Sequence, residues 1–328
     1  MAPSFLSFAS LYSFYLRHCF TSSGLSQKSI NIGDETTIHF WAPTQLRQSK
    51  PNLVFIHGFG PVSLWQWRQQ GINLELPFSE IIRTRQSSKR NCCVGLVQFF
   101  APDFNLYVPD LIFFGDSTTK SSERSEIFQA ESVAKLLETL GVEKYSLVGT
   151  SYGGFVSYHI ARMFPERVEK VVIASSGVNM KKKNNEELVK RAKLEKIDDL
   201  MLPQKPSDLR ALLGVAVSKP SLLMVPDFFL NDLINKLFAE NRNKKVELLS
   251  GLTIGQDGSV NISPLQQDVL LVWGDKDQVF PLEMAKDLQG LIGKNVRLEI
   301  IKDTSHVPQI ENAAEFNEII RKFLGASP

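Results

Sequence analysis

The chain has 328 residues, of which 43% are hydrophobic and 22% charged, and its formal net charge is +2. This length and composition are typical of an α/β protein with one large domain and an insertion, and the nearly balanced charge argues against a nucleic-acid partner. The three cysteines are too few for a disulfide framework, which favours an intracellular, cytoplasmic setting.

The N-terminal segment, residues 1–27, is apolar and rich in Phe, Tyr and Ser, and no acidic residue precedes Asp34. Arg17 follows the apolar part, whereas a signal peptide has its positive charge before it. No run reaches the ~18 apolar residues that a membrane span needs. We expect a helix that packs on the domain, with peripheral membrane contact or organellar targeting as alternatives. The aromatic residues at helical spacing are Phe5, Phe8, Tyr12 and Tyr15.

Short apolar runs alternate with helical patterns along most of the chain. The runs are continuous and rich in Val, Ile and Leu, as expected for strands buried on both faces of a parallel sheet. The predicted strands are 38–41, 53–56, 106–108, 146–148, 171–174, 269–273 and 296–301. The predicted helices are 131–140, 152–164, 282–291 and 313–324. This order predicts an α/β fold with a doubly wound, mostly parallel sheet.

The alternation stops between about residues 181 and 264. This stretch contains helical segments, several prolines and a run of three lysines, but no convincing strand pattern. We therefore predict a helical cap, residues 181–264, inserted between two late strands. It would divide the α/β core into a first part, 28–180, and a second part, 265–328.

A G-x-S-x-G motif lies between a predicted strand and a predicted helix, at Gly149-Thr150-Ser151-Tyr152-Gly153. This context is typical of a nucleophile elbow, whereas an ordinary Gly-rich turn would not need the serine. Gly149 and Gly153 permit a sharp turn that exposes Ser151 Oγ at the carboxyl edge of the sheet. The following helix directs its N-terminus at the site, where a developing anion is favoured.

A serine hydroxyl needs a base, and the chain supplies an acid and a histidine after its late strands. Asp277 lies in WGDKDQVFP (273–281), and His306 lies in DTSHVP (303–308). Their order, Ser then acid then His, is that of an α/β-hydrolase. We predict that His306 is the base and that Asp277 orients it. Asp275 is the competing acid, which we interpret as a turn residue that bonds nearby backbone.

His57, in FIHGFG (55–60), follows a predicted strand directly and is interpreted as a structural histidine that shapes the loop. The same loop, with Gly58, should supply the N–H of Phe59 as one oxyanion donor, and the N–H of Tyr152 should be the other. No Cys/His cluster has metal-ligand spacing, and the glycines of this loop lack the lysine of a phosphate loop, so we expect no metal and no cofactor. Two further histidines are predicted to be structural or exposed: His39 and His159.

From about residue 28 to 324 these motifs resemble the α/β-hydrolase superfamily of serine esterases and lipases. PDLIFFGDS (109–117) is similar to the family's loop after its fourth strand, where the acid corresponding to Asp110 holds the loop. FPERV (164–168) is similar to the end of the family's post-nucleophile helix. The chain is similar in particular to plant proteins grouped with monoacylglycerol lipases and with C–C-bond hydrolases of ring-cleavage products. The epoxide-hydrolase branch uses Asp where Ser151 stands, which argues against that branch.

The resemblance implies a serine hydrolase that acts on a small-molecule ester or lipid. We expect a carboxylic ester with an apolar acyl chain, since the cap runs 209–217 and 222–233 could line an apolar pocket. Two alternatives stay open. One is hydrolysis of a C–C bond in a ring-cleavage product, and the other is a ligand receptor on the same fold with slow or absent turnover.

Residues 71–96 (GINLELPFSEIIRTRQSSKRNCCVGL) interrupt what the family pattern would continue as one helix. The segment contains two of the three cysteines, and its four basic and two acidic residues give it a charge of +2, equal to that of the whole chain. We interpret it as a retained intron or an erroneous gene model, with a surface-loop insertion as the alternative. We expect residues 83–91 to be poorly ordered. Without the segment, four apolar residues would share one helix face: Leu64, Trp67, Val97 and Phe100.

Overall fold

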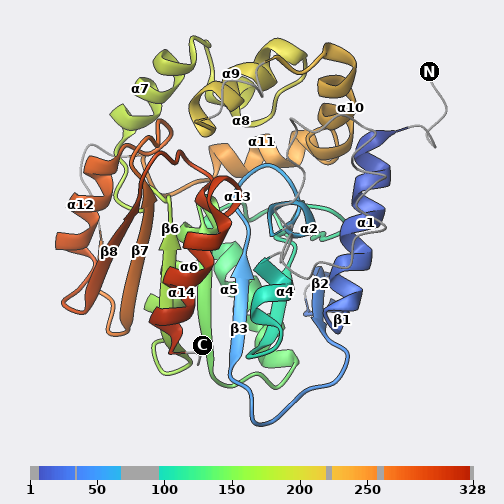
Figure 1. Ribbon diagram of the computed structural model, residues 1–328, viewed down its shortest axis with the longest axis vertical. Helices are drawn as coiled ribbons and strands as arrows, with labels where there is room; N and C mark the ends of the chain where they lie inside the picture. Colours follow the sequence, from blue (N-terminus) through green and yellow to red (C-terminus); the bar gives the residue numbers. More distant parts are fainter. Residues whose placement is uncertain (1–6, 34, 68–95, 219–223, 257–261, 326–328) are drawn as a thin grey trace.

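The computed structural model describes residues 7–33, 35–67, 96–218, 224–256 and 262–325. Within them the chain forms an eight-stranded sheet in the order β1-β2-β4-β3-β5-β6-β7-β8 (Figure 1). The pairs β1·β2 and β2·β4 are antiparallel and the other pairs are parallel, which confirms the predicted fold class. The strands are β1 (Leu25–Asn31), β2 (Thr37–Pro43), β3 (Asn52–Ile56), β4 (Asn105–Pro109), β5 (Tyr145–Thr150), β6 (Val168–Ala174), β7 (Asp268–Gly274) and β8 (Val296–Ile301).

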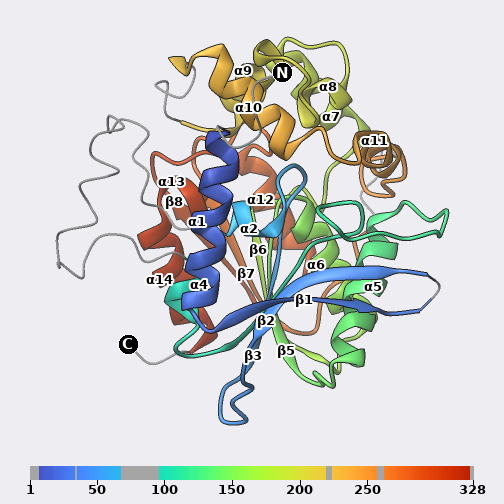
Figure 2. The same ribbon diagram turned by 90° about the vertical axis from the view of Figure 1, so that its right-hand side faces the viewer.

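Helices cover both faces of the sheet, because successive side chains of each buried strand point to opposite sides. In β5, Leu147 packs into the apolar cluster on one face and Val148 into the cluster on the other. The first cluster includes side chains of α5 (Glu126–Thr139), α6 (Tyr152–Met163) and α12 (Leu282–Leu291). The second includes side chains of α1 (Phe8–Ser22), α4 (Leu96–Phe100) and α14 (Ala313–Leu324); α5 and α6 lie across the sheet from α1, α4 and α14 (Figure 2).

A helical insertion lies between β6 and β7, over one end of the sheet (Figure 1). Apolar side chains on its inner side, such as Leu188 and Leu200, join the core cluster of the sheet, so the insertion is packed on the core. It places helices near the ends of the parallel strands, where α/β folds bind their ligands. Its helices are α7 (Lys182–Ala192), α8 (Ile197–Met201), α9 (Pro206–Ala216), α10 (Asp227–Leu237) and α11 (Arg242–Ser250).

The first helix and the first strand lie beside each other at one edge of the sheet. As expected, α1 packs on the domain, and it does so through Ala9, Leu16 and Phe20. Strand β1 was not predicted, because its exposed positions, including Lys28, hide the alternation. In the described parts of the chain, no helix is both long and apolar enough to cross a membrane.

The segment 71–96 lies almost wholly outside the described residues. The prediction that residues 83–91 are poorly ordered therefore also concerns residues that the structure does not describe. The short helix α2 (Ser63–Gln66) precedes it and α4 follows it. The four apolar residues expected to share one helix face are all buried in a single cluster on the same side of the sheet: Leu64, Trp67, Val97 and Phe100.

Candidate active site

Ser151 lies in a sharp turn between β5 and α6. Its backbone has φ 52° and ψ −121°, a conformation that side chains other than glycine rarely adopt. The two glycines of the motif are required by close packing: a Cβ on Gly149 would lie 2.2 Å from the carbonyl oxygen of Gly153, and one on Gly153 would lie 2.1 Å from that of Ile56. The turn therefore matches the predicted elbow in its conformation and in its need for glycine.

Neighbouring strands hold this turn in place. The N–H of Ser151 donates to the carbonyl oxygen of Ala174 (2.9 Å), and the hydroxyl of Ser176 donates to the carbonyl oxygen of Ser151 (2.6 Å). Two bonds from the end of β6 thus stabilise a backbone conformation that costs about 1–3 kcal/mol by itself.

The structure brings Ser151, His306 and Asp277 together from three separate segments. His306 Nε2 lies 3.1 Å from Ser151 Oγ, and His306 Nδ1 lies 3.0 Å from Asp277 Oδ2. The other carboxylate oxygen of Asp277 accepts the N–H groups of Val279 (2.8 Å) and Phe280 (2.9 Å). The side chain of Asp277 has no exposed surface, so its charge acts on the imidazole with little screening by water. This arrangement can move a proton from Ser151 to His306.

Asp275 has a different environment from Asp277. Its carboxylate accepts the N–H of Thr304 (3.3 Å) and is exposed, as expected of a turn residue that bonds nearby backbone. The loop that carries His306 is held by Glu311, whose Oε2 accepts the N–H of Ser305 (2.6 Å). The N–H of His306 itself donates to the carbonyl oxygen of Ala216 in α9 (3.1 Å). Sequence reasoning did not find Glu311, because no local pattern relates it to His306.

The loop after β3 lies directly against Ser151. A Cβ added to Gly58 would lie 3.0 Å from Ser151 Cβ, so any larger residue would crowd Ser151. The N–H of Gly58 donates to Gln66 Oε1 of α2, and this hydrogen bond holds the loop to α2. The rings of Phe59 and Tyr152 pack edge to face at 5.6 Å. The two residues expected to donate oxyanion hydrogen bonds are therefore neighbours beside Ser151. Gln66 was missed from sequence, because no local pattern relates it to Gly58.

His57 is fully buried and bonds only backbone groups among the described residues. Its Nε2 accepts the N–H of Leu111 (3.0 Å), so Nδ1 carries the proton that bonds the carbonyl oxygen of Gly58 (2.8 Å). Burial, with a smaller contribution from the nearby Lys245 ammonium, lowers the pKa of His57 to about 4, while the bond to the Gly58 carbonyl acts to raise it. Asp110 accepts the N–H of Ser63 (2.8 Å), and burial raises the pKa of its carboxyl group to about 6. These contacts join the loops after β3 and β4.

The remaining candidate histidines lie away from Ser151. His159 is buried, with Nε2 3.5 Å from Glu126 Oε1, and His39 is partly exposed, with Nδ1 3.8 Å from Asp116 Oδ2. Within the described ranges, no group of three or more His, Cys, Asp or Glu side chains could hold a metal ion.

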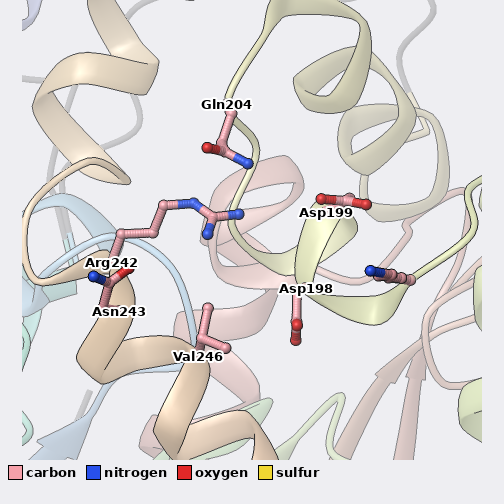
Figure 3. Close-up of a pocket in the computed structure, with 7 residues that line it drawn as sticks. Asp198, Asp199, Gln204, Arg242, Asn243 and Val246 are labelled. Atoms are coloured by element: carbon pink, nitrogen blue, oxygen red, sulfur yellow. The ribbon is translucent and has the colours of Figure 1, made fainter.

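A hollow with a volume of 420 Å³ opens on the helical insertion, and Figure 3 shows the Arg242 side chain extending toward Gln204 across it. None of the candidate catalytic residues lines it, and its lining is mostly polar or charged. It is therefore separate from the candidate active site. The lining residues are Lys196, Asp198, Asp199, Gln204, Arg242, Asn243 and Val246.

The family model described as "alpha/beta hydrolase fold" matches residues 51–313. The chain therefore belongs to the alpha/beta hydrolase fold family, and its coarse activity class is that of a hydrolase. A curated relative, the 2-hydroxy-6-oxononadienedioate/2-hydroxy-6-oxononatrienedioate hydrolase of Paraburkholderia phymatum, is 27% identical over 92% of this chain and 96% of its own length.

Solved structures have the same fold. A bacterial membrane phospholipase A superposes with a TM-score of 0.70 at 21% identity, covering 97% of this chain and 90% of its own. The 2-hydroxy-6-oxo-6-phenylhexa-2,4-dienoate hydrolase of Rhodococcus superposes with a TM-score of 0.69 at 21% identity, covering 92% of this chain and 99% of its own. At this identity the structures establish the fold alone.

Proposed function

We propose that the chain is a serine hydrolase that cleaves carboxylic esters with an apolar acyl chain. The observation that carries this proposal is the continuous hydrogen-bonded arrangement of Ser151, His306 and Asp277 around a strained turn. A hydroxyl within hydrogen-bond reach of an imidazole, itself oriented by a buried carboxylate, is the arrangement that activates serine as a nucleophile.

In the proposed reaction, Ser151 Oγ attacks the ester carbonyl carbon while His306 Nε2 takes its proton. Asp277 keeps the Nδ1–H of His306 in place and stabilises the imidazolium that forms. The N–H groups of Phe59 and Tyr152 would hold the oxyanion. His306 then gives its proton to the leaving alkoxide. A water molecule, deprotonated by His306, then attacks the acyl carbon; the acyl–Oγ bond breaks, His306 returns the proton to Ser151 Oγ, and the acid is released.

The side chains around the site support an apolar acyl group. The Phe280 ring lies 5.5 Å from the His306 imidazole, and a Cβ on Gly60 would lie 3.5 Å from the ring of Phe238, at the end of α10. Ala216 of α9 contacts the backbone of His306. Phe280 after β7 thus places an apolar ring beside His306, and Phe238 of the helical insertion places another beside the loop after β3; such groups suit an acyl chain better than a charged substrate.

Hydrolysis of a C–C bond is a second candidate, favoured by the similarity to the Paraburkholderia phymatum hydrolase. The dioate in that protein's name is a dicarboxylate, which calls for a cation in the site. Lys245 of α11 is buried, and its Nζ lies 4.9 Å from the Phe114 ring. That ring in turn packs against Phe59 at 5.3 Å. In this candidate the Lys245 ammonium would hold a substrate carboxylate.

Two measurements on the purified chain test the proposal. A fluorophosphonate probe should label Ser151, and a series of nitrophenyl esters of increasing acyl length should show repeated turnover with a preference for longer chains. Labelling without ester turnover, together with cleavage of a vinylogous diketone, would favour C–C hydrolysis. Product formation that stops near one equivalent would indicate a receptor and overturn the proposal.

A further inference from the structure

An exposed apolar surface spans α1 and the start of α10. Five of the eight large hydrophobic side chains that are exposed in the described parts of the chain lie here. This concentration on two segments is unlike the single apolar side chains that are scattered over an ordinary protein surface. We call these residues the aromatic surface: Leu11 (61% exposed), Phe14 (76%), Tyr15 (46%), Met224 (85%) and Phe228 (66%).

Ring contacts connect two members of the aromatic surface, Phe228 and Tyr15, across the two helices, which lie side by side in Figure 1. The ring of Phe228 lies 4.3 Å from that of Phe229 in a tilted arrangement, and the ring of Phe229 lies 5.6 Å from that of Phe8. On α1, Phe8 lies 6.3 Å from Tyr12, and Tyr12 lies 6.0 Å from Tyr15. These rings thus form a connected series from α10 of the helical insertion along α1.

The inner face of α1 is anchored, so the aromatic surface is a preformed platform. The Trp65 indole N–H donates to Ser13 Oγ (2.9 Å), and the N–H of Ala9 donates to Asp232 Oδ2 of α10 (2.8 Å). Leu16 and Phe20 are buried in the core. The exposed side chains of α1 therefore project from a helix whose position is already set by other contacts.

The charges around the aromatic surface favour an anionic partner. The first 33 residues contain no Asp or Glu. Arg17 and His18 lie one turn from Phe14 on α1 and are both exposed, and Arg17 donates to the uncharged Gln27 side chain (2.6 Å). The acid at the start of α10, Asp227, is paired with Arg210 (2.6 Å).

We propose that the aromatic surface docks on an anionic phospholipid membrane. Phe and Tyr rings and Leu11 would enter the boundary between headgroups and acyl chains, and Arg17 would lie near the phosphates. The helical insertion would then be held at the membrane through α10. This inference goes beyond ester hydrolysis and does not depend on it, because exposure, ring contacts and charge carry it.

The test is co-sedimentation of the full chain with vesicles of equal parts phosphatidylcholine and phosphatidylserine. The unmodified chain should bind, and Leu11→Ser and Phe14→Ser should each lower the partition coefficient about tenfold or more, since each removes one large apolar side chain from the contact. Leu46→Ser is the matched control. Leu46 is 62% exposed, nearly the same as Leu11, and lies in the loop between β2 and β3.

The proposal predicts that Leu46→Ser binds vesicles like the unmodified chain and that all three variants keep the same melting temperature and the same turnover of a soluble ester. Equal binding by all variants, or no binding by the unmodified chain, would overturn it. So would a dimer in sedimentation velocity that Phe14→Ser dissociates while vesicle binding is absent, because the partner would then be a second copy. Vesicle binding is measured without any assay of activity. The result therefore tests this proposal even if the proposed esterase function fails.

Discussion

Two regions beside the end of β5 each combine a buried His, an Asp and a Ser, and they use them differently. In the first, His306 bonds the side chains of Asp277 and Ser151. In the second, His57 bonds the backbone of Leu111 and Gly58 on its two nitrogens, and the Asp110 carboxylate accepts the backbone N–H of Ser63. The residue types match, but the bonding partners do not.

The difference shows what determines the role of a buried histidine. His57 has both nitrogens committed to main-chain groups, so it has no side-chain partner with which to exchange a proton. It joins two loops instead. His306 links a hydroxyl to a carboxylate, so a proton can move along the bonds. We therefore expect changes in the first region to lower the rate of reaction and changes in the second to lower stability.

The largest expected effect is on catalysis in the first region. Ser151→Ala should abolish fluorophosphonate labelling and lower ester turnover by about 10⁴-fold or more, because it removes the proposed nucleophile. His306→Ala should cost nearly as much, since the two side chains act as a unit. The thermal melt should change little, because the lost Ser151 hydroxyl faces the site. Labelling that persists in Ser151→Ala would contradict the assignment.

The two aspartates after β7 should differ sharply. Asp277→Asn removes the charge that orients His306 and should lower turnover by about 10²- to 10⁴-fold. Asp275→Asn is the matched control, because it keeps an acceptor for the N–H of Thr304 and should leave turnover within about threefold. The measurement is the steady-state rate of each variant and of the wild type on one ester. A larger loss in Asp275→Asn than in Asp277→Asn would reverse the choice of acid.

Deleting residues 71–96 should improve both regions together if the segment is a retained intron or a gene-model error. It would restore one helix after the loop that carries Phe59, and a better-placed oxyanion donor should raise turnover by up to about 10²-fold. Melting temperature and ester turnover of the full and shortened chains are the comparison. A shortened chain that is less stable or less active would show that the segment is a genuine part of the fold.

A change in the second region should act on stability. His57→Ala leaves the buried N–H of Leu111 without its acceptor and creates a cavity, so it should lower the free energy of unfolding by about 2–4 kcal/mol. The remaining folded protein should still label with the probe. Because the folded pKa is about 4, below the unfolded value of about 6.5, the wild type loses stability as pH falls from 6.5 to 4. Denaturant titrations should show that His57→Ala lacks this loss.

The last expected effect is confined to high pH and concerns Lys245, which lies over Phe114 beside His57. Burial lowers the pKa of Lys245 to about 8, while Glu240 and Asp110 act to raise it. The unfolded chain binds the proton up to about pH 10.5, so this burial penalty is full below pH 8 and is relieved as pH rises toward 10.5. Relative to Lys245→Met, the wild type should gain up to about 3 kcal/mol over that range. A stability difference that does not change with pH would contradict a buried, charged lysine.

The sequence by itself determined the α/β class, the elbow and the position of the candidate serine and histidine. These features depend on local chemistry. Apolar runs identify buried strands within a few residues. The glycines of the elbow are needed because Gly149 and Gly153 meet backbone oxygen atoms at about 2 Å, so their pattern reports the turn directly.

Tertiary structure alone decided which groups hold the loops around those residues. The sequence favoured Asp277 over Asp275 as the acid, and the fold brings Asp277 Oδ2 within 3.0 Å of His306 Nδ1. Gln66 and Glu311 hold loops through bonds to Gly58 and Ser305 that no sequence pattern marks. The ring contacts between α1 and α10 could not be predicted from the sequence either. Such pairings depend on how strands and loops distant in the chain are stacked, and a side chain's local sequence carries no information about that.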